Sequence, residues 1–152
     1  AIVKVHPYNT EEIATAHKES CIGFIKRFKN CFTVNYDLLL YWVLMTDDGD
    51  SLFSDLFTRE ADTPDKYCEY ATSQKGDNNV YYLHGALHIL QSRGRVFKLV
   101  WKTTGRPLIQ QVIEAMDDGK YPMVVAEGTP ESKLKQIKEN QYLNFIFHTL
   151  DL

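Results

Sequence analysis

Cysteines, long apolar runs and excess charge are all scarce in this chain of 152 residues, and each scarcity excludes a class of protein. The three cysteines, at positions 21, 31 and 68, form no Cys-x-x-Cys pair, so neither a disulfide framework nor a zinc knuckle is expected. The longest apolar run, 38–45, is far shorter than the roughly 20 residues of a membrane span. The first residues contain no apolar stretch typical of a signal peptide. We therefore expect a cytoplasmic protein in which Cys21 and Cys31 are buried as small hydrophobic side chains.

The charge balance argues against nucleic acid as a partner. Lys and Arg number 17 against 20 Asp and Glu, which gives a net charge of −3 and no sign of a basic face. Hydrophobic residues make up 44% and charged residues 24%, as in ordinary globular proteins. A chain of this length is expected to form a single domain, 1–152, whose core needs no metal or disulfide. An oligomer remains open.

The residue patterns predict helices that alternate with short apolar strands. Helices are expected at 10–28, at 38–45 (although this run would also suit a strand), from Pro107 to Gly119, from Thr129 and from Asn140 onward. Strands are expected at 31–34, 80–84, 86–91, 95–101 and 123–126, of which the first, second and last are buried. The polar segment 62–79 is expected to be a surface excursion with a short helix around Tyr67 and Tyr70. Residues 47–50 are expected to form a solvated acidic turn.

This alternation predicts an α/β protein with a Rossmann-like parallel sheet, helices on both faces and a β-hairpin insertion that turns at 92–94. Ligands of such sheets bind at the carboxyl ends of the strands. Three segments are expected at that edge: Asn35–Asp37, His84–Gly85 and Glu127–Thr129.

Each of these segments also has a purely structural interpretation. Asp37 and Thr129 can cap helices, and Asn35 suits a turn. His84 can be a partly buried core histidine. If His84 and His88 lie on one strand, about 13 Å separates them, at ~3.3 Å per residue, so they cannot share a metal. We therefore expect His88 to be structural, packed beside the hairpin.

The joint placement of an amide, a carboxylate and an imidazole favours hydrolysis of a glycosidic bond. An imidazole can take a proton from water or from a ribose hydroxyl. An amide and a carboxylate can position the sugar, and negative charge stabilises an oxocarbenium-like transition state.

The same residues carry a family resemblance. The run Thr33-Val34-Asn35-Tyr36-Asp37 resembles the Thr-x-Asn-Tyr-Asp signature of sirtuin-like NAD-consuming domains. Leu83-His84-Gly85 resembles their Leu-His-Gly signature, and the polar insertion between the two motifs is similar as well. Together with the segment 121–128, these motifs resemble a bacterial branch of that group over about residues 24–150.

The resemblance implies a site and a substrate. It implies that Asn35 and His84 are the catalytic pair and that the substrate is NAD, with no metal. It further implies that Asp37 supports the nicotinamide-ribose end, and we expect the remaining NAD-binding residues to be Tyr36, Gly85, Gly128 and Thr129.

The departures from the family pattern bear on function. No two glycines are spaced as Gly-x-Gly, and no Gly-x-Ser strand follows the last helix, so the chain resembles the central part of such a domain. Three scattered cysteines cannot form the four-cysteine zinc module of sirtuin deacylases. We therefore expect an NAD glycohydrolase, of the kind associated in its relatives with bacterial defence by NAD depletion. The alternative is a non-catalytic nucleotide-binding or protein-interaction module of the same fold.

Overall fold

Two sheets of different kinds form the framework of the computed structural model, which describes residues 7–46, 52–59, 64, 66–73, 76–125 and 128–150. A two-stranded parallel sheet pairs β1 (Asn30–Thr33) with β4 (Asn79–Tyr82). A five-stranded sheet has the order β2-β3-β6-β5-β7, and every neighbouring pair in it is antiparallel. Its strands are β2 (Phe57–Thr58), β3 (Tyr67–Tyr70), β5 (Gly85–Ser92), β6 (Arg95–Leu99) and β7 (Tyr121–Val124).

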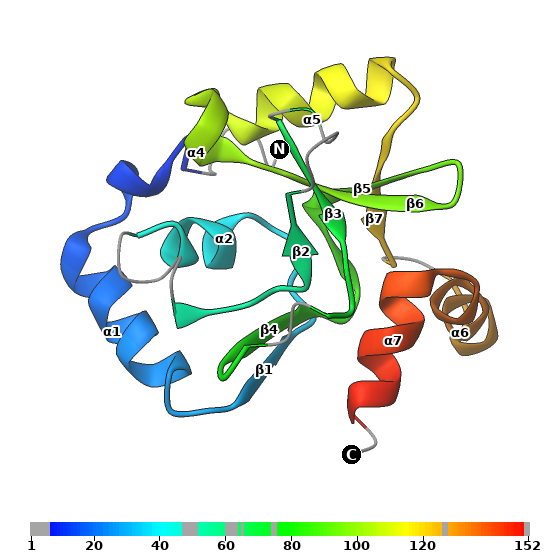
Figure 1. The fold of residues 1–152 in the computed structure, drawn as a ribbon, viewed down its shortest axis with the longest axis horizontal. Coiled ribbons are helices and arrows are strands. Elements are labelled where there is room, and N and C mark those ends of the chain that lie inside the picture. Colours follow the sequence, from blue (N-terminus) through cyan, green and yellow to red (C-terminus); the bar gives the residue numbers. More distant parts are fainter. Residues whose placement is uncertain are drawn as a thin grey trace.

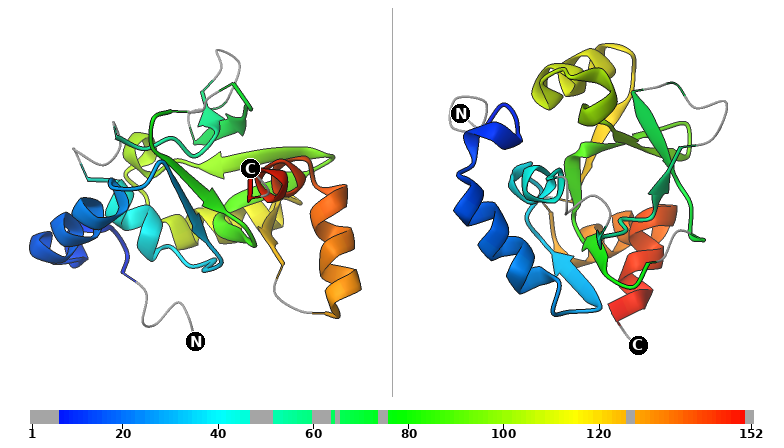
Figure 2. Two further views of the ribbon diagram at one scale, coloured as in Figure 1. Left: turned by 90° about the horizontal axis from the view of Figure 1, so that it is seen from below. Right: turned by 60° about the vertical axis from the view of Figure 1, so that its left-hand side comes forward.

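Helices surround the two sheets (Figure 1). They are the 3-10 helix η2 (Thr10–Glu12), α1 (Thr15–Ile25), α2 (Leu39–Leu44), α4 (Trp101–Thr104), α5 (Leu108–Asp117), α6 (Pro130–Glu139) and α7 (Gln141–Leu150). Helix α5 packs on β5, β6 and β7, and α7 packs on β4 and α6. Helices α1 and α2 contact each other and lie on the side of the molecule away from α6 and α7 (Figures 1 and 2).

The prediction of a Rossmann-like parallel sheet is wrong. The chain reverses at the hairpin between β5 and β6, and α4 and α5 then carry it across β5 to β7. Because that crossover makes β7 parallel to β6, both strands run antiparallel to β5, which lies between them. Only β1 and β4 keep the parallel pairing that the alternation of helices and strands suggested.

Several expected elements are confirmed. Helices α2, α5, α6 and α7 and the β5–β6 hairpin all form where the patterns placed them. Three polar side chains accept backbone amides at helix starts. The Leu39 amide donates to Asp37 Oδ1, the Ser132 amide donates to Thr129 Oγ1, and the Leu143 amide donates to Asn140 Oδ1. These are local signals, and they operate in the folded protein as they do in an isolated segment.

Other local expectations need correction. The helix expected at 10–28 is divided into η2 and α1, with Asn9 capping η2 through the Glu11 amide. Phe24 and Phe28 face solvent, 62% and 47% exposed, and pack edge-to-face on each other. Three more corrections follow: β1 and β7 are only partly buried, the region of Tyr67 and Tyr70 is strand β3, and Trp101 begins a helix.

Some inward positions were also misjudged. Cys21 and Cys31, expected to be buried, are only half-buried. Side chains expected on buried helix faces are exposed instead at Ile113, Met116, Leu134, Phe147 and Leu150. The acidic turn expected at 47–50 lies outside the described residues. No helix in the described ranges is long and apolar enough to cross a membrane.

His88 is a buried histidine without a polar partner. Its side chain is fully buried, 4.6 Å from the Tyr41 ring and 5.1 Å from the Tyr82 ring, centroid to centroid. Neither ring nitrogen has a hydrogen-bond partner among the described residues. Burial lowers the pKa of His88 well below its usual range, and the charge of Lys98 on β6 lowers it further. The folded protein therefore holds this imidazole neutral.

This burial predicts acid sensitivity. Below the ordinary histidine pKa of about 6.5, His88 binds a proton in the unfolded chain but not in the folded protein. The free energy of unfolding therefore falls by up to about 1.4 kcal/mol for each pH unit. We expect His88→Leu to lose this part of the pH dependence while remaining folded at pH 7. Urea denaturation between pH 5 and 7.5 measures it, with His17→Ala on the exposed side of α1 as the control. An unchanged slope in His88→Leu would contradict this account.

Candidate functional site

The parallel pairing of β1 and β4 brings the two sequence motifs to one edge. Thr33 and Tyr82, the last residues of the two strands, are register partners. Beyond them, the Leu83 amide donates to the Thr33 carbonyl and the Leu87 amide donates to the Tyr36 carbonyl, both at 2.9 Å. The segments that carry Asn35 and His84 are therefore bonded to each other at the carboxyl ends of neighbouring parallel strands, as the sequence predicts.

The Asn35 side chain is held by Asp37. Asn35 Nδ2 donates to Asp37 Oδ2 at 2.6 Å, while Asp37 Oδ1 accepts from the Leu39 amide at 2.8 Å. The Asn35 amide donates to Thr33 Oγ1 at 3.0 Å. Asp37 thus accepts from the first amide of α2, whose N-cap is Leu38, and orients the Asn35 carboxamide at the same time. Asn35 and Tyr36 are exposed, so both can meet a ligand from solvent.

His84 lies at the junction of the two sheets. It is half-buried, between the end of β4 and the start of β5, and its carbonyl accepts from the Val125 amide at 2.9 Å. This bond brings the end of β7 beside His84. Parts of three chain segments, around residues 35, 84 and 125, therefore meet at one edge.

The backbone conformation at the start of β5 requires a glycine at position 85. Its φ is +74°, and a Cβ atom at this position would stand 1.7 Å from the Met123 carbonyl oxygen. Gly85 pairs with Val124 in the β5–β7 ladder and is buried. The pairing of β5 with β7 thus accounts for Gly85 independently of any ligand.

Gly128 and Thr129 form the start of α6. Thr129 Oγ1 accepts from the Ser132 amide at 3.3 Å, which makes it the helix cap. Gly128 has a φ of +115° and approaches the Ser132 side chain. Their position soon after Val125 agrees with the expected edge, while residues 126 and 127 lie outside the described part of the chain.

Two further kinds of side chain, the thiols and the metal-binding groups, bear on the chemistry of the described residues. Burial raises the pKa of the Cys21 and Cys31 thiols, which disfavours the reactive thiolate. No group of three or more His, Cys, Asp or Glu side chains in the described ranges could hold a metal ion.

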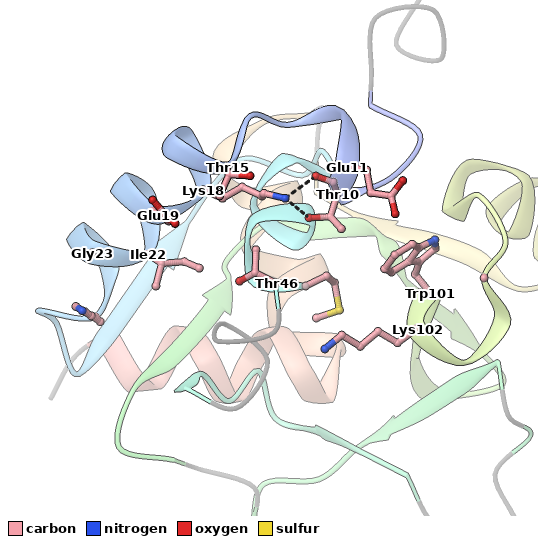
Figure 3. Close-up of a pocket in the computed structure, with 13 residues that line it drawn as sticks. Thr10, Glu11, Thr15, Lys18, Glu19, Ile22, Gly23, Thr46, Trp101 and Lys102 are labelled. Carbon is pink, nitrogen blue, oxygen red and sulfur yellow. Dashed lines mark hydrogen bonds between the residues drawn. The ribbon is translucent and has the colours of Figure 1, made fainter.

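Sequence reasoning missed a large cavity elsewhere. It has a volume of about 740 Å³ and lies between α1, α4 and the end of α2 (Figure 3). Its charged and aromatic lining includes Lys18, Lys26, Trp101 and Lys102. These residues come from segments about 75 positions apart with no shared motif, so no local pattern in the sequence could have found them.

These features define a mixed α/β protein whose candidate site lies on a parallel strand pair joined to an antiparallel sheet. The family model described as "Domain of unknown function (DUF4917)" matches residues 1–151, so the chain belongs to this family. Searches of curated proteins and of solved structures found no significant match.

The close approach at Gly85 gives a prediction with a matched control. Gly85→Ala should lower the free energy of unfolding by about 3 kcal/mol or more, because the Cβ would collide with the Met123 carbonyl and φ would be strained. Gly119 has nearly the same φ, +73°, but open space around it, so Gly119→Ala should cost only about 1 kcal/mol. Urea denaturation of both variants compares the costs. Equal costs would show that the β5–β7 contact is not as tight as described.

Proposed function

We propose that this protein hydrolyses the bond between nicotinamide and ribose in NAD, with Asn35 and His84 as its catalytic residues. The observation that carries the proposal is the parallel β1–β4 register, which brings the two motif segments together. The proposal draws on this local edge and on the motif resemblance described above. It needs only the parallel pair β1–β4 and does not depend on a Rossmann-like sheet.

The edge offers the groups that such a reaction needs. The His84 imidazole can accept a proton from water or a ribose hydroxyl as the water oxygen bonds to the ribose carbon and nicotinamide leaves. The Asn35 carboxamide has its Nδ2 bonded to Asp37, so its Oδ1 is directed by that bond and can hold a hydroxyl of the ribose or the water.

In the proposed reaction, Asp37 places a negative charge next to the ribose. The ribose becomes oxocarbenium-like as the glycosidic bond breaks, and a nearby carboxylate stabilises that positive charge. Because Asp37 also accepts from the Leu39 amide, its carboxylate is held in place before substrate binds. Tyr36 is exposed beside it and is a candidate to contact the nicotinamide end.

We assign the remaining contacts with the substrate to the residues near the start of α6 and to Gly85. The free backbone N–H groups near the start of α6, at Gly128 and Thr129, suit an anionic or ribose-like part of the substrate. Gly85 belongs to this edge through its position next to His84, because the Met123 carbonyl fills the space where its side chain would stand. We place the activity in the cytoplasm, where cysteines that form no disulfide stay reduced.

We expect His84→Ala to lower the rate of nicotinamide release from NAD by about 10²–10⁴, the usual contribution of a general base. Asn35→Ala should lower it similarly, because positioning of water or ribose is lost. Neither change should unfold the protein, since Asn35 is exposed and His84 is only half-buried. Nicotinamide release is measured by chromatography, and circular dichroism checks the fold.

His148→Ala is the matched control, because His148 is exposed on α7, away from the motif edge. It should leave nicotinamide release unchanged. Hydrolysis that persists in His84→Ala would refute the catalytic assignment. Binding of NAD without nicotinamide release, in wild type and variants alike, would instead support the non-catalytic nucleotide-binding module.

A further inference from the structure

The cavity next to α1 has the size of a small-molecule site. Its volume of about 740 Å³ falls within the roughly 300–1,000 Å³ of typical ligand pockets. Figure 3 shows its lining converging from η2, α1, the end of α2 and α4. None of the residues assigned to the motif edge lines this cavity.

One wall is apolar and contains a fixed aromatic ring. Ile22, Met45 and Trp101 contribute to it. The Trp101 ring packs edge-to-face on the buried Trp42, with 5.6 Å between centroids, and the Trp101 amide donates to Tyr41 Oη at 3.0 Å. Since both its ring and its backbone are held, Trp101 is suited to stack on a planar ring without losing much conformational freedom.

Among the described residues, the charged part of the lining is cationic on balance. Three lysines, Lys18, Lys26 and Lys102, face two glutamates, Glu11 and Glu19, in a protein whose net charge is −3. Lys18 Nζ is already positioned by a 3.0 Å hydrogen bond to the Thr10 carbonyl. A second, longer bond of 3.4 Å joins Lys18 Nζ to Thr10 Oγ1, and since an ammonium group has three donors, Lys18 retains one donor for an anion.

Gly23 is a second, independent observation that points to a ligand in the cavity. Glycine inside a helix costs about 0.5–1 kcal/mol relative to alanine. A Cβ at Gly23 would meet no neighbouring atom within 4 Å, so packing does not explain the glycine. Because Gly23 lines the cavity, its missing side chain adds to the room for a ligand.

We propose that this cavity binds an organic anion in which a planar ring is joined to a phosphate, such as a nucleotide. Trp101 would stack on the ring, and the three lysines would neutralise the phosphate. The proposal is independent of NAD hydrolysis at the motif edge, because it concerns different residues and a binding measurement.

The protein contains a reporter for occupancy. It has two tryptophans, of which Trp42 is fully buried and Trp101 lines the cavity. ADP titrated into the full chain should therefore quench tryptophan fluorescence and saturate with a micromolar to low-millimolar Kd. Trp101→Phe should remove the quenching. Adenosine and inorganic phosphate, each offering half of the recognised chemistry, should bind at least about tenfold more weakly than ADP.

Variants then locate the site, with affinities taken from isothermal titration. Gly23→Leu fills the cavity, so ADP should bind at least about tenfold more weakly while thermal stability is kept or raised. Lys26→Gln and Lys102→Gln should each weaken ADP binding about fivefold or more and leave adenosine binding unchanged. Lys138→Gln, an exposed lysine on α6, is the charge-matched control and should change nothing.

Three outcomes would overturn the proposal. They are no ADP binding at 10 mM, unchanged ADP affinity in Gly23→Leu, or equal affinity for ADP and adenosine. ADP binding that is lost in Asn35→Ala but kept in Gly23→Leu would place the nucleotide at the motif edge and refute the cavity site alone. Loss of NAD hydrolysis in His84→Ala with intact ADP binding would leave both proposals standing.

Discussion

The backbone contact between Gly85 and the end of β7 is the constraint on which the rest of this structure depends. Here the chain passes from the parallel strand pair into the antiparallel sheet, at a glycine with positive φ pressed against the Met123 carbonyl. The neighbouring bond from the Val125 amide to the His84 carbonyl fixes the same junction from the other side. Because a side chain cannot be accommodated there, the position of His84 follows from backbone packing.

The core beneath this junction is aromatic and contains unusual polar groups. Tyr142 Oη accepts from the Tyr82 amide at 3.3 Å, which joins α7 to β4. Burial raises the pKa of Tyr82 well above its usual range, and the nearby Asp55 carboxylate adds to this effect. Asp55 itself pairs with Lys98 at 2.5 Å in a mostly buried ion pair. The Asp55–Lys98 pair joins the segment before β2 to β6, and a shifted register of β6 would leave these mostly buried charges unpaired.

Helix α2 connects the two places where we propose chemistry and binding. Its first amide donates to Asp37, which also holds Asn35, and the residues just after its end, Met45 and Thr46, line the cavity. The helix itself is anchored in the core by Tyr41 and Trp42. A ligand in the cavity would therefore contact one end of a short, firmly packed helix whose other end orients the candidate catalytic amide.

The sequence by itself determined the local features of this protein. Polar side chains near helix starts at Asp37, Thr129 and Asn140, the turn at Arg93–Gly94 and the apolar runs act within a few residues, so helices α2, α5, α6 and α7 and the hairpin could be predicted from it. The approach of the backbone segments that carry Asn35 and His84 was also predictable, since it needs only two parallel strands. The antiparallel order β6-β5-β7, the tight contact at Gly85 and the cavity between α1 and Trp101 were decided by the tertiary structure. Their partners are distant in the chain, and helices alternating with strands look the same in sequence whether a strand enters its sheet parallel or antiparallel.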